Sequence, residues 1–446
     1  MKNQITRRDF GKLGAAAGLT YSFISRLAPA APQNYASNKV IAAVAGVRSR
    51  GKYLASKFAS IPNCRVKYVI DVDSRYLPDA AAAVEKAQGS IPEQIKDFRS
   101  ALDDKEVDLL VIASPDHWHA PMGIAALAAG KHVYVEKPCS HNPAEGEMFI
   151  AAQKKYGGIV QMGNQRRSFK IVEQMIDEIH GGVIGDVYYA KTWYSNKRGP
   201  IGYGKKVDVP AYLDWNLWQG PAPRTDYRDN IHPYNWHWFW NWGTGESLNN
   251  ASHELDVARW ALKVDYPKRV NSTAGRIHYP NQDDWQFWDT QNIAIQYKDD
   301  RMITWEGLSG SQYKTYDRET RGVAFFGDKG VIEYYSNRYK ILDLDGKLIR
   351  EEAPGKKSDT SSTNTIDPGL NDYHAENLIN AIIGKGKVNS PIDEGHKSIL
   401  LGHLANISAK LNTTLECDPA SGHIINNAKA IKMWSREYEP GWEPKF

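Results

Sequence analysis

The sequence has little cysteine and no excess of charge of one sign, and each shortage excludes a class of protein. Three cysteines occur in 446 residues, without any Cys-x-x-Cys spacing: Cys64, Cys139 and Cys417. Isolated cysteines in odd number indicate neither a zinc site nor a disulfide framework, so we expect no metal and interpret all three as packing residues. The 56 basic and 52 acidic residues are interspersed and leave a net charge of +4, so no nucleic-acid partner is expected.

Long apolar runs are also missing. No segment of the expected mature chain reaches the roughly 18 uninterrupted apolar residues of a membrane-spanning helix, so no stable membrane insertion is expected. A mildly apolar stretch, residues 13–27, follows the twin arginines Arg7 and Arg8 and precedes small residues at 28–30. This order is typical of a twin-arginine signal peptide. Residues 1–36 are therefore expected to be a signal peptide and linker that direct the folded protein to the periplasm.

A chain of this length is expected to form two domains. Over residues 37–163, short apolar segments alternate with segments of helical spacing, which predicts a doubly wound α/β domain around a parallel sheet. Over residues 164–446 the strands become longer and alternate polar with apolar residues, which predicts an α+β domain with a large open mixed or antiparallel sheet. The expected strands are 39–45, 66–72, 107–113, 132–135, 159–162, 187–194, 291–297, 302–308, 323–326 and 331–335, and the expected helices are 51–60, 80–87, 122–129, 145–155, 372–383 and 397–411.

The first expected strand leads into a glycine-rich turn, Gly46-Val47-Arg48-Ser49-Arg50-Gly51. It matches a dinucleotide-binding fingerprint in which Arg48 replaces the middle glycine. The first glycine permits the tight turn and the last permits close packing of helix on strand, while amide groups at the helix start hold the pyrophosphate. The cofactor-binding residues predicted in this turn are Gly46, Arg48, Ser49, Arg50 and Gly51.

An acidic residue stands where the fingerprint requires one. Asp71 ends the second expected strand, twenty residues after Gly51. An acid at this place binds the ribose 2′-hydroxyl and repels a 2′-phosphate, so NAD is the expected cofactor and NADP is disfavoured. The nearby Arg75 leaves the use of both cofactors open.

Three further motifs resemble the signatures of the Gfo/Idh/MocA family, named after glucose–fructose oxidoreductase, inositol dehydrogenase and a rhizopine-catabolism protein. They are Ser114-Pro115-Asp116-His117-Trp118-His119, Lys131-His132-Val133-Tyr134-Val135-Glu136-Lys137-Pro138, and the glycine-rich segment from Gly243 through Asn249 and His253 to Asp256. The similarity covers nearly the whole chain after residue 36. It implies a Rossmann NAD-binding domain, a C-terminal substrate domain whose helix 372–383 returns to the Rossmann domain, and oxidoreductase activity on CH–OH groups.

The resemblance also implies roles for single residues. Lys137 would lie beside the nicotinamide and stabilise charge on the substrate oxygen, and His253 would act as acid or base. Many relatives carry aspartate where this chain has Asn249, which can orient a hydroxyl or a histidine but cannot accept a proton. His253 or Lys137 would then carry the proton alone. The resemblance further places Ser114, Pro115, His119, Glu136, Lys137 and Asn164 at the cofactor, and Arg167, Asn249 and His253 at the substrate.

Six of the fourteen tryptophans fall in one segment: Trp215, Trp218, Trp236, Trp238, Trp240 and Trp242. The segment also carries polar residues and leads directly into the third motif. Aromatic faces beside hydroxyl-binding groups suit a pyranose ring, so Trp236 and His237 are expected to bind a sugar. A packed aromatic core or a subunit interface would explain the same pattern equally well.

Together these features predict an exported NAD-dependent oxidoreductase that acts on a hydroxyl or keto group of a sugar or glycoside, with glycoside 3-oxidation as one form. Its cofactor is expected to be tightly bound, because free nicotinamide nucleotide is confined to the cytoplasm. A redox-neutral NAD-dependent glycosidase is the first alternative, and the intact Glu136-Lys137-Pro138 favours net oxidation or reduction over it. The second is a non-catalytic sugar- or NAD-binding protein. A homo-oligomer is left open.

Overall fold

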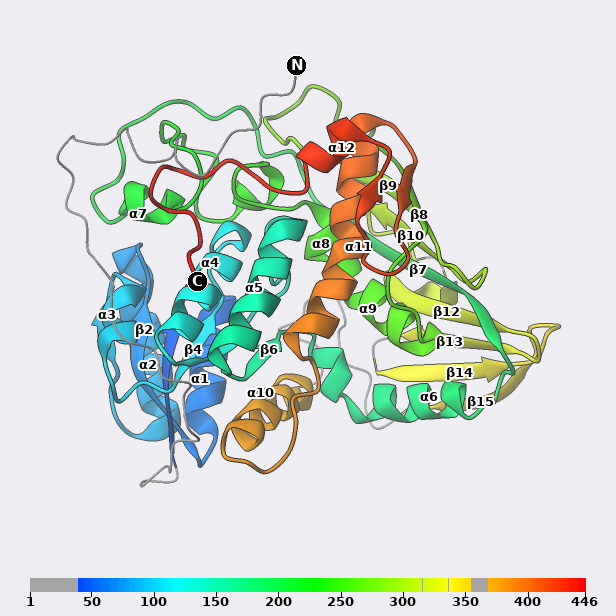
Figure 1. Cartoon of the computed structure of the whole chain (residues 1–446), viewed down its shortest axis with the longest axis horizontal. Coiled ribbons are helices and arrows are strands. Elements are labelled where there is room, and N and C mark those ends of the chain that lie inside the picture. The colour runs from blue at the N-terminus through cyan, green and yellow to red at the C-terminus, as the bar shows by residue number, and fades with distance from the viewer. Residues whose placement is uncertain (1–38, 315, 336, 354–367) are drawn as a thin grey trace, which may run out of the picture. The chain divides into compact units, whose positions relative to one another are not determined.

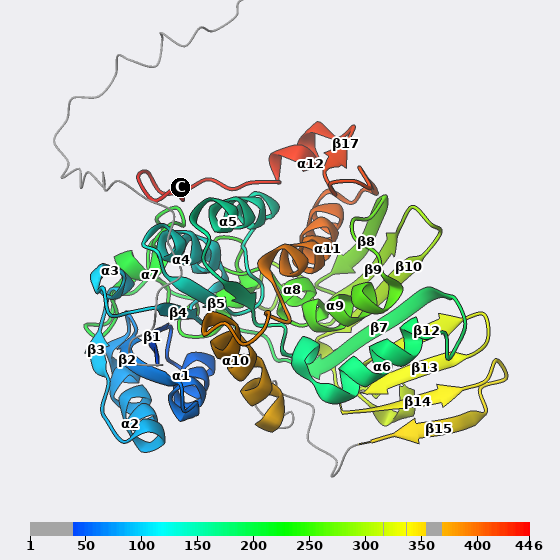
Figure 2. The ribbon, with the colours of Figure 1, turned by 60° about the horizontal axis from the view of Figure 1, so that its bottom comes forward.

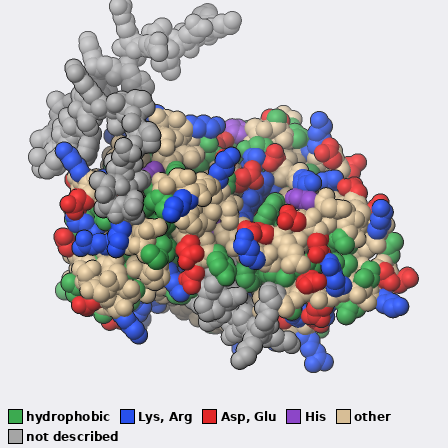
Figure 3. Space-filling view, turned by 90° about the horizontal axis from the view of Figure 1, so that it is seen from below, with side chains coloured by type: hydrophobic (Ala, Val, Ile, Leu, Met, Phe, Trp, Pro, Cys, Tyr) green, Lys and Arg blue, Asp and Glu red, His purple; other side chains and the backbone are tan. Residues whose placement is uncertain are grey.

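The computed structural model describes residues 39–314, 316–335, 337–353 and 368–446 (Figure 1). The predicted signal peptide and linker, residues 1–36, lie outside the described residues. No helix within the described ranges is long and apolar enough to cross a bilayer. On the face shown in Figure 3, basic and acidic side chains are interspersed, as the balanced composition predicts.

Six parallel strands form the first sheet, in the order β3-β2-β1-β4-β5-β6. The order reverses between β1 and β4, as in dinucleotide-binding Rossmann domains, and ligands bind at such a reversal. The inner strands are apolar along their whole length because helices cover both faces of the sheet. The strands are β1 Val40–Ala45, β2 Cys64–Ile70, β3 Glu93–Ile95, β4 Leu109–Ile112, β5 His132–Val135 and β6 Val160–Met162.

Helices from both halves of the chain cover this sheet. On one face lie α1 (Arg50–Ser60), α2 (Leu77–Gln88) and α10 (Pro368–Ile382), and buried residues of all three pack on the strands. The other face is covered by α3 (Phe98–Asp103), α4 (Asp116–Ala128) and α5 (Pro143–Tyr156). The return of α10 confirms what the resemblance implies, so the predicted second domain contributes to the core of the first.

The second sheet is mixed and larger, in the order β15-β14-β13-β12-β7-β10-β9-β8-β16-β17, with β11 paired to β7. Only β7 and β10 pair in parallel among these neighbours. Helices α6 (Lys170–His180), α9 (Ala251–Leu262) and α11 (Ile392–Leu411) cover one face and form its core (Figure 2). The strands are β7 Val187–Lys197, β8 Arg269–Gly275, β9 Thr290–Gln296, β10 Met302–Leu308, β11 Gly310–Ser311, β12 Arg321–Gly327, β13 Val331–Tyr335, β14 Arg338–Leu342, β15 Leu348–Glu352, β16 Leu415–Cys417 and β17 Ile424–Ile425.

Sequence patterns missed several elements. Helix α4 begins at Asp116 and not at the predicted residue 122, although Pro121 lies inside it. Proline cannot donate to the carbonyl four residues earlier, that of His117, and this oxygen instead accepts a hydrogen bond of 2.8 Å from Arg436. Helix α6 and strands β8, β14 and β15 were not predicted. Strand β15 is exposed along most of its length, so it has no polar–apolar alternation to detect. The three cysteines are buried and free, as predicted.

Candidate functional site

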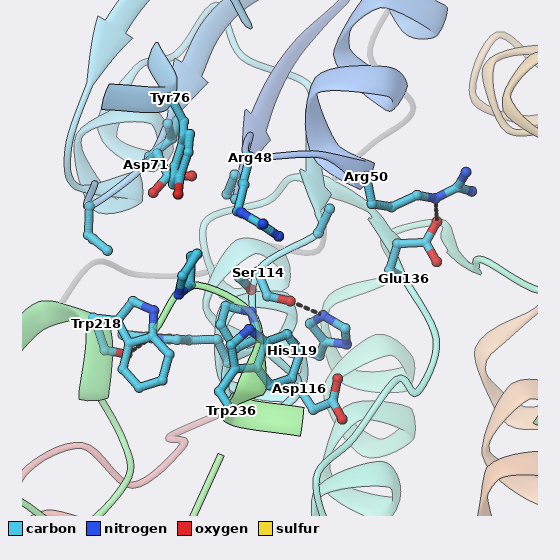
Figure 4. Close-up of a pocket in the computed structure, with 18 of the residues that line it drawn as sticks. Arg48, Arg50, Asp71, Tyr76, Ser114, Asp116, His119, Glu136, Trp218 and Trp236 are labelled. Atoms are coloured by element: carbon cyan, nitrogen blue, oxygen red, sulfur yellow. Dashed lines mark hydrogen bonds and ion pairs between the residues drawn. The ribbon is translucent and has the colours of Figure 1, made fainter. Parts of the chain in front are cut away.

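A pocket of about 280 Å³ opens along the carboxyl edge of the Rossmann sheet (Figure 4). Its walls come from the loops after β1, β2, β4 and β5, and from the long connection between β7 and α8 (Glu246–Asn249), which we call the insert, residues 198–245. The predicted site residues that line it are Gly46, Arg48, Ser49, Arg50, Asp71, Ser114, Pro115, His119, Glu136, Lys137, Trp236, His237 and Asn249. Gly51, Asn164, Arg167 and His253 were also predicted and do not line it.

Both glycines of the fingerprint are required by close approaches of backbone. Gly46 has φ +83°, and a Cβ there would lie 2.5 Å from the backbone nitrogen of Ser114. A Cβ on Gly51 would lie 2.0 Å from the carbonyl oxygen of Gly46. Any side chain at either place would therefore push the turn away from the sheet and disturb the start of α1, whose amide groups face the pocket.

Asp71 is held rigidly at the adenosine end of the pocket. Its two carboxylate oxygens accept backbone hydrogen bonds from Val47, at 2.8 Å, and from Asp73, at 2.9 Å. Each oxygen keeps a lone pair for a ribose hydroxyl. Burial raises the pKa of Asp71 to about 7. The residue therefore fits the predicted ribose-binding role.

Arg75, the residue that left NADP open, is already engaged by its neighbours. Its guanidinium donates to both carboxylate oxygens of Asp73, at 3.0 and 2.7 Å, and stacks on the ring of Tyr212 at 3.5 Å. Contact with a 2′-phosphate would have to break this arrangement. The geometry therefore favours NAD.

The insert is bonded to the Rossmann domain on both sides of the pocket. Near Asp71, the amide of Asp214 donates to the carbonyl of Val72 at 3.0 Å. Near α4, the carbonyl of Trp218 lies 3.0 Å from Nε2 of His117 and accepts from Nε1 of Trp118 at 3.0 Å. Pocket and insert are thus one hydrogen-bonded unit.

The tryptophans of the insert divide between pocket and core. Trp236 lines the pocket and stacks on His237, with ring centroids 3.6 Å apart, and Trp218 also lines it. Trp238 instead stacks on Trp285, at 4.0 Å, in a separate buried cluster. Some of these rings therefore line the pocket and others pack in a core, and binding of a sugar by Trp236 and His237 stays a prediction.

Lys137 projects from the end of β5 and is fixed by Asn249. Its ammonium nitrogen donates to the backbone carbonyl oxygen of Asn249, at 2.5 Å, and to the side-chain Oδ1, at 3.1 Å. The carbonyl is available because the helix breaks here: the amide of His253 bonds to Asn250, at 3.2 Å, and not to Asn249. Burial lowers the pKa of Lys137, so the amine is closer to its neutral form than an exposed lysine.

His253 lies in the first turn of α9, buried behind the pocket lining. Its Nε2 has no hydrogen-bond partner among the described residues. Burial, together with the charges of Lys137 and Arg321, lowers its pKa well below the ordinary value. The ring is therefore neutral, and it is a weaker base than an exposed histidine.

Two residues predicted at the site lie elsewhere. Arg167 does not face the pocket, because its guanidinium forms a buried ion pair with Asp256 at 2.8 to 3.0 Å. The side-chain amide of Asn164 is buried and makes no hydrogen bond within the described part of the chain. Sequence could place both after β6, but the direction of a side chain after a strand end depends on tertiary packing.

Other predicted residues hold the pocket together. Arg50 pairs with Glu136 at 2.7 Å, to the side of the pocket in Figure 4. The ring nitrogens of His119 lie 2.6 and 2.7 Å from the carbonyl oxygens of Pro138 and Ser114. His119 therefore ties the motif Ser114–His119 to the motif Lys131–Pro138.

Several pocket residues were not predicted, among them Tyr76, Tyr234 and Asp116. Asp116 lies within the motif Ser114–His119 and lines the pocket, and its carboxylate accepts a hydrogen bond from the Thr244 hydroxyl at 2.6 Å. Burial raises the pKa of Asp116. An acid directly after Ser114-Pro115 was the available signal. In the described ranges, no group of three or more His, Cys, Asp or Glu is placed to bind a metal.

Comparison with protein families gives two matches that together cover most of the chain. A model of an oxidoreductase family with an NAD-binding Rossmann fold matches residues 41–164, and a model of that family's C-terminal α/β domain matches residues 176–416. The fingerprint glycines, Asp71 and Lys137 lie in the first matched range, and Asn249 and His253 lie in the second.

Individual relatives are distant. Inositol 2-dehydrogenase of Salmonella typhimurium is 26% identical over 215 residues, which are 48% of this chain and 48% of that protein. A glycosyl hydrolase family 109 protein of Saccharopolyspora erythraea is 27% identical over 204 residues, 39% of this chain and 44% of its own length. The chain thus spans about half the length of each. The solved complex of levoglucosan dehydrogenase with NADH and levoglucosan is similar in fold, with a TM-score of 0.64 and 19% identity over 85% of this chain and 99% of that one.

Proposed function

Because the chain belongs to the Gfo/Idh/MocA oxidoreductase family and binds NAD through its Rossmann domain, we propose that it is an exported enzyme that oxidises or reduces a carbon of a sugar or glycoside. The observation that carries the proposal is the position of Lys137, which is half-buried, fixed by Asn249 and located in the same pocket as the fingerprint turn and Asp71.

The residues around Lys137 suit transfer of a hydride. NAD, when bound, supplies the hydride acceptor. Removing hydride from a carbinol carbon also requires a base for the hydroxyl proton and a cation beside the developing alkoxide. Lys137 lines the pocket and its pKa is lowered, so the neutral form of its amine can take the proton, and the ammonium so formed can stabilise the oxygen. His253 does not line the pocket, and its lowered pKa makes it the weaker candidate for the base. Asn249 cannot accept a proton, so its role is to hold the amine of Lys137 in place.

A sugar ring fits the other walls of the pocket. Trp218 and Trp236 offer aromatic faces, and His237 and Asn249 offer polar groups for hydroxyls. Two relatives are named for activity on inositol and on levoglucosan, which are both rich in neighbouring hydroxyls. These names support a polyol or sugar substrate for this chain. Oxidation at the 3-position of a glycoside is one reaction of this class.

The location of the enzyme determines how it obtains its cofactor. Arg7 and Arg8 at the head of the apolar stretch support export of the folded protein by the twin-arginine route to the periplasm. An exported enzyme must carry its nucleotide with it. The insert, bonded to the Rossmann domain on both sides of the pocket, supports retention of NAD. Replacing both arginines with lysine and fractionating the cells tests export, because the variant should stay in the cytoplasm.

The main experiment is to denature the purified protein and identify any released nucleotide and its redox state. NADH formation is then followed with myo-inositol, levoglucosan and a set of glycosides as substrates. Release of NAD(H) together with a new carbonyl in one sugar supports the proposal. If a folded protein releases no nucleotide and forms no new carbonyl, the non-catalytic sugar- or NAD-binding alternative remains.

A redox-neutral NAD-dependent glycosidase is the second candidate, and the family 109 relative favours it. In such a reaction oxidation is transient, so the aglycone leaves without net formation of NADH. Nitrophenyl glycosides distinguish the two activities. Release of nitrophenol with deuterium uptake from D₂O at the carbon next to the oxidised one would identify the glycosidase, whereas NADH accumulation would identify the dehydrogenase.

A further inference from the structure

Arg48 stands where the fingerprint normally has its middle glycine. That glycine lets the backbone approach the diphosphate of the cofactor. The Arg48 side chain reaches from the turn after β1 into the pocket, as Figure 4 shows. Its guanidinium carbon lies 5.9 Å from the ring centroid of Tyr76, in the Rossmann domain, and 5.9 Å from that of Tyr234, in the insert. The residue therefore bridges the two walls of the pocket.

The charge of Arg48 is not neutralised by a carboxylate. Arg50, two residues on, pairs with Glu136 at 2.7 Å, whereas Arg48 makes no ion pair with any described residue. The first turn of α1 contains no acidic residue, and its N-cap Ser49 makes no side-chain hydrogen bond. A free cation and a free helix N-terminus thus face the same part of the pocket, which suits a doubly charged anion.

The field of Arg48 reaches across the pocket to the insert. Burial is the main cause that lowers the pKa of His232 to about 4 and of His237 to about 3, and the charge of Arg48 is a smaller contribution to both. These histidines are therefore neutral and do not compete with Arg48 for an anion.

We propose that Arg48 is a clamp for the cofactor: its guanidinium pairs with the NAD diphosphate while Tyr76 and Tyr234 pack on either side. In an ordinary Rossmann domain the diphosphate is held by backbone amides, and here it would gain a charged partner that also contacts the insert. Release of NAD then requires Arg48 and Tyr234 to separate. The inference deepens the proposed resident cofactor, and it rests on NAD binding but not on the sugar reaction or on export.

The test uses a variant that restores the ordinary fingerprint, Arg48→Gly. A charge-assisted hydrogen bond to the diphosphate predicts that affinity for NADH and for ADP-ribose falls roughly 10- to 100-fold, while affinity for adenosine does not change. Exchange of bound NAD for labelled NAD should accelerate by a similar factor. Tyr234→Leu, which keeps the cation, should accelerate exchange with a smaller loss of ADP-ribose affinity. Lys52→Ala, which removes a cation from α1 at its exposed side, is the matched control and should change neither quantity.

Three outcomes would overturn the clamp. One is wild-type exchange and wild-type ADP-ribose affinity in a folded Arg48→Gly protein. The second is loss of NADPH affinity with NADH affinity kept, which would assign Arg48 to a 2′-phosphate. The third is an equal loss of adenosine affinity, which would show a general disturbance of the turn. If wild-type protein purifies without nucleotide, the resident cofactor of the proposed function fails, and titration of NADH into both proteins still decides the role of Arg48.

Discussion

The amine of Lys137 is bound by both oxygens of a single residue, Asn249. One is the backbone carbonyl oxygen, which a break between α8 and α9 leaves free, and the other is the side-chain Oδ1 at 3.1 Å. Relatives with aspartate at this position would have a charge there. In this chain the amide of Asn249 positions the lysine without offering it a negative charge. Burial can therefore lower the pKa of Lys137.

Lys137→Ala should lower kcat by about 10²- to 10³-fold, because removing one preorganised charge partner of the developing oxyanion costs about 2.7–4 kcal/mol. Asn249→Ala should lower kcat much less, since the backbone carbonyl still holds the amine. Initial rates with a responsive sugar measure both. A Lys137→Ala enzyme with unchanged kcat and a raised KM would show that the lysine only binds substrate.

Asn249→Asp should shift the pH profile of oxidation. The new carboxylate, 3.1 Å from the amine, stabilises the protonated form and raises the pKa of Lys137. A raised pKa leaves less neutral amine at a given pH, so the acid limb should move to higher pH. Asn249→Leu introduces no charge and serves as the control. An unmoved limb in the aspartate variant would leave His253 as the group that titrates.

Selectivity for NAD over NADP should increase with pH. Burial raises the pKa of Asp71 to about 7, so the carboxylate that repels a 2′-phosphate forms as pH rises through that value. The ratio of Kd values for NADPH and NADH, measured at pH 6 and pH 8, should therefore grow. The phosphate itself also gains charge near pH 6. Asp71→Asn controls for this contribution. In that variant the ratio of Kd values should be smaller and should change less between pH 6 and pH 8.

Arg167→Ala should destabilise the protein without raising KM, because Arg167 is the buried partner of Asp256 and not a substrate ligand. Removing one partner of a buried pair costs about 3–5 kcal/mol of unfolding free energy. Denaturant unfolding measures the loss. The double variant Arg167→Met, Asp256→Leu should recover part of it. A stable Arg167→Ala protein with a high KM would restore the sequence-based role.

Acid should destabilise the fold through its buried histidines. Burial lowers the pKa of His403 to about 3 from an ordinary 6.5, so as pH falls below 6.5 the unfolded chain binds a proton that the folded chain does not. Each such histidine removes about 1.4 kcal/mol per pH unit until its folded pKa is reached. His403→Gln should flatten the dependence of unfolding free energy between pH 7 and 5.

The cofactor half of the site follows from local sequence, because its residues lie at fixed places around one strand–turn–helix unit. The turn requires Gly46, the start of the helix requires Gly51, and the end of the next strand carries Asp71. All three lie where the pattern predicts. The strands around them were found for the same reason. A strand buried on both faces is apolar throughout, whereas exposed β15 carries no such pattern.

The sequence alone thus determined the Rossmann domain and its NAD site, and it identified Lys137 and His253 as the pair to examine, while the signal peptide stays a prediction. Only tertiary structure decided which side chains face the pocket. Arg167 turned to Asp256, Asn249 turned to Lys137, and most of the tryptophans packed on one another. The directions of these side chains depend on contacts between segments far apart in the chain, such as β5 with α8. The spacing of residues along the sequence does not reveal such contacts.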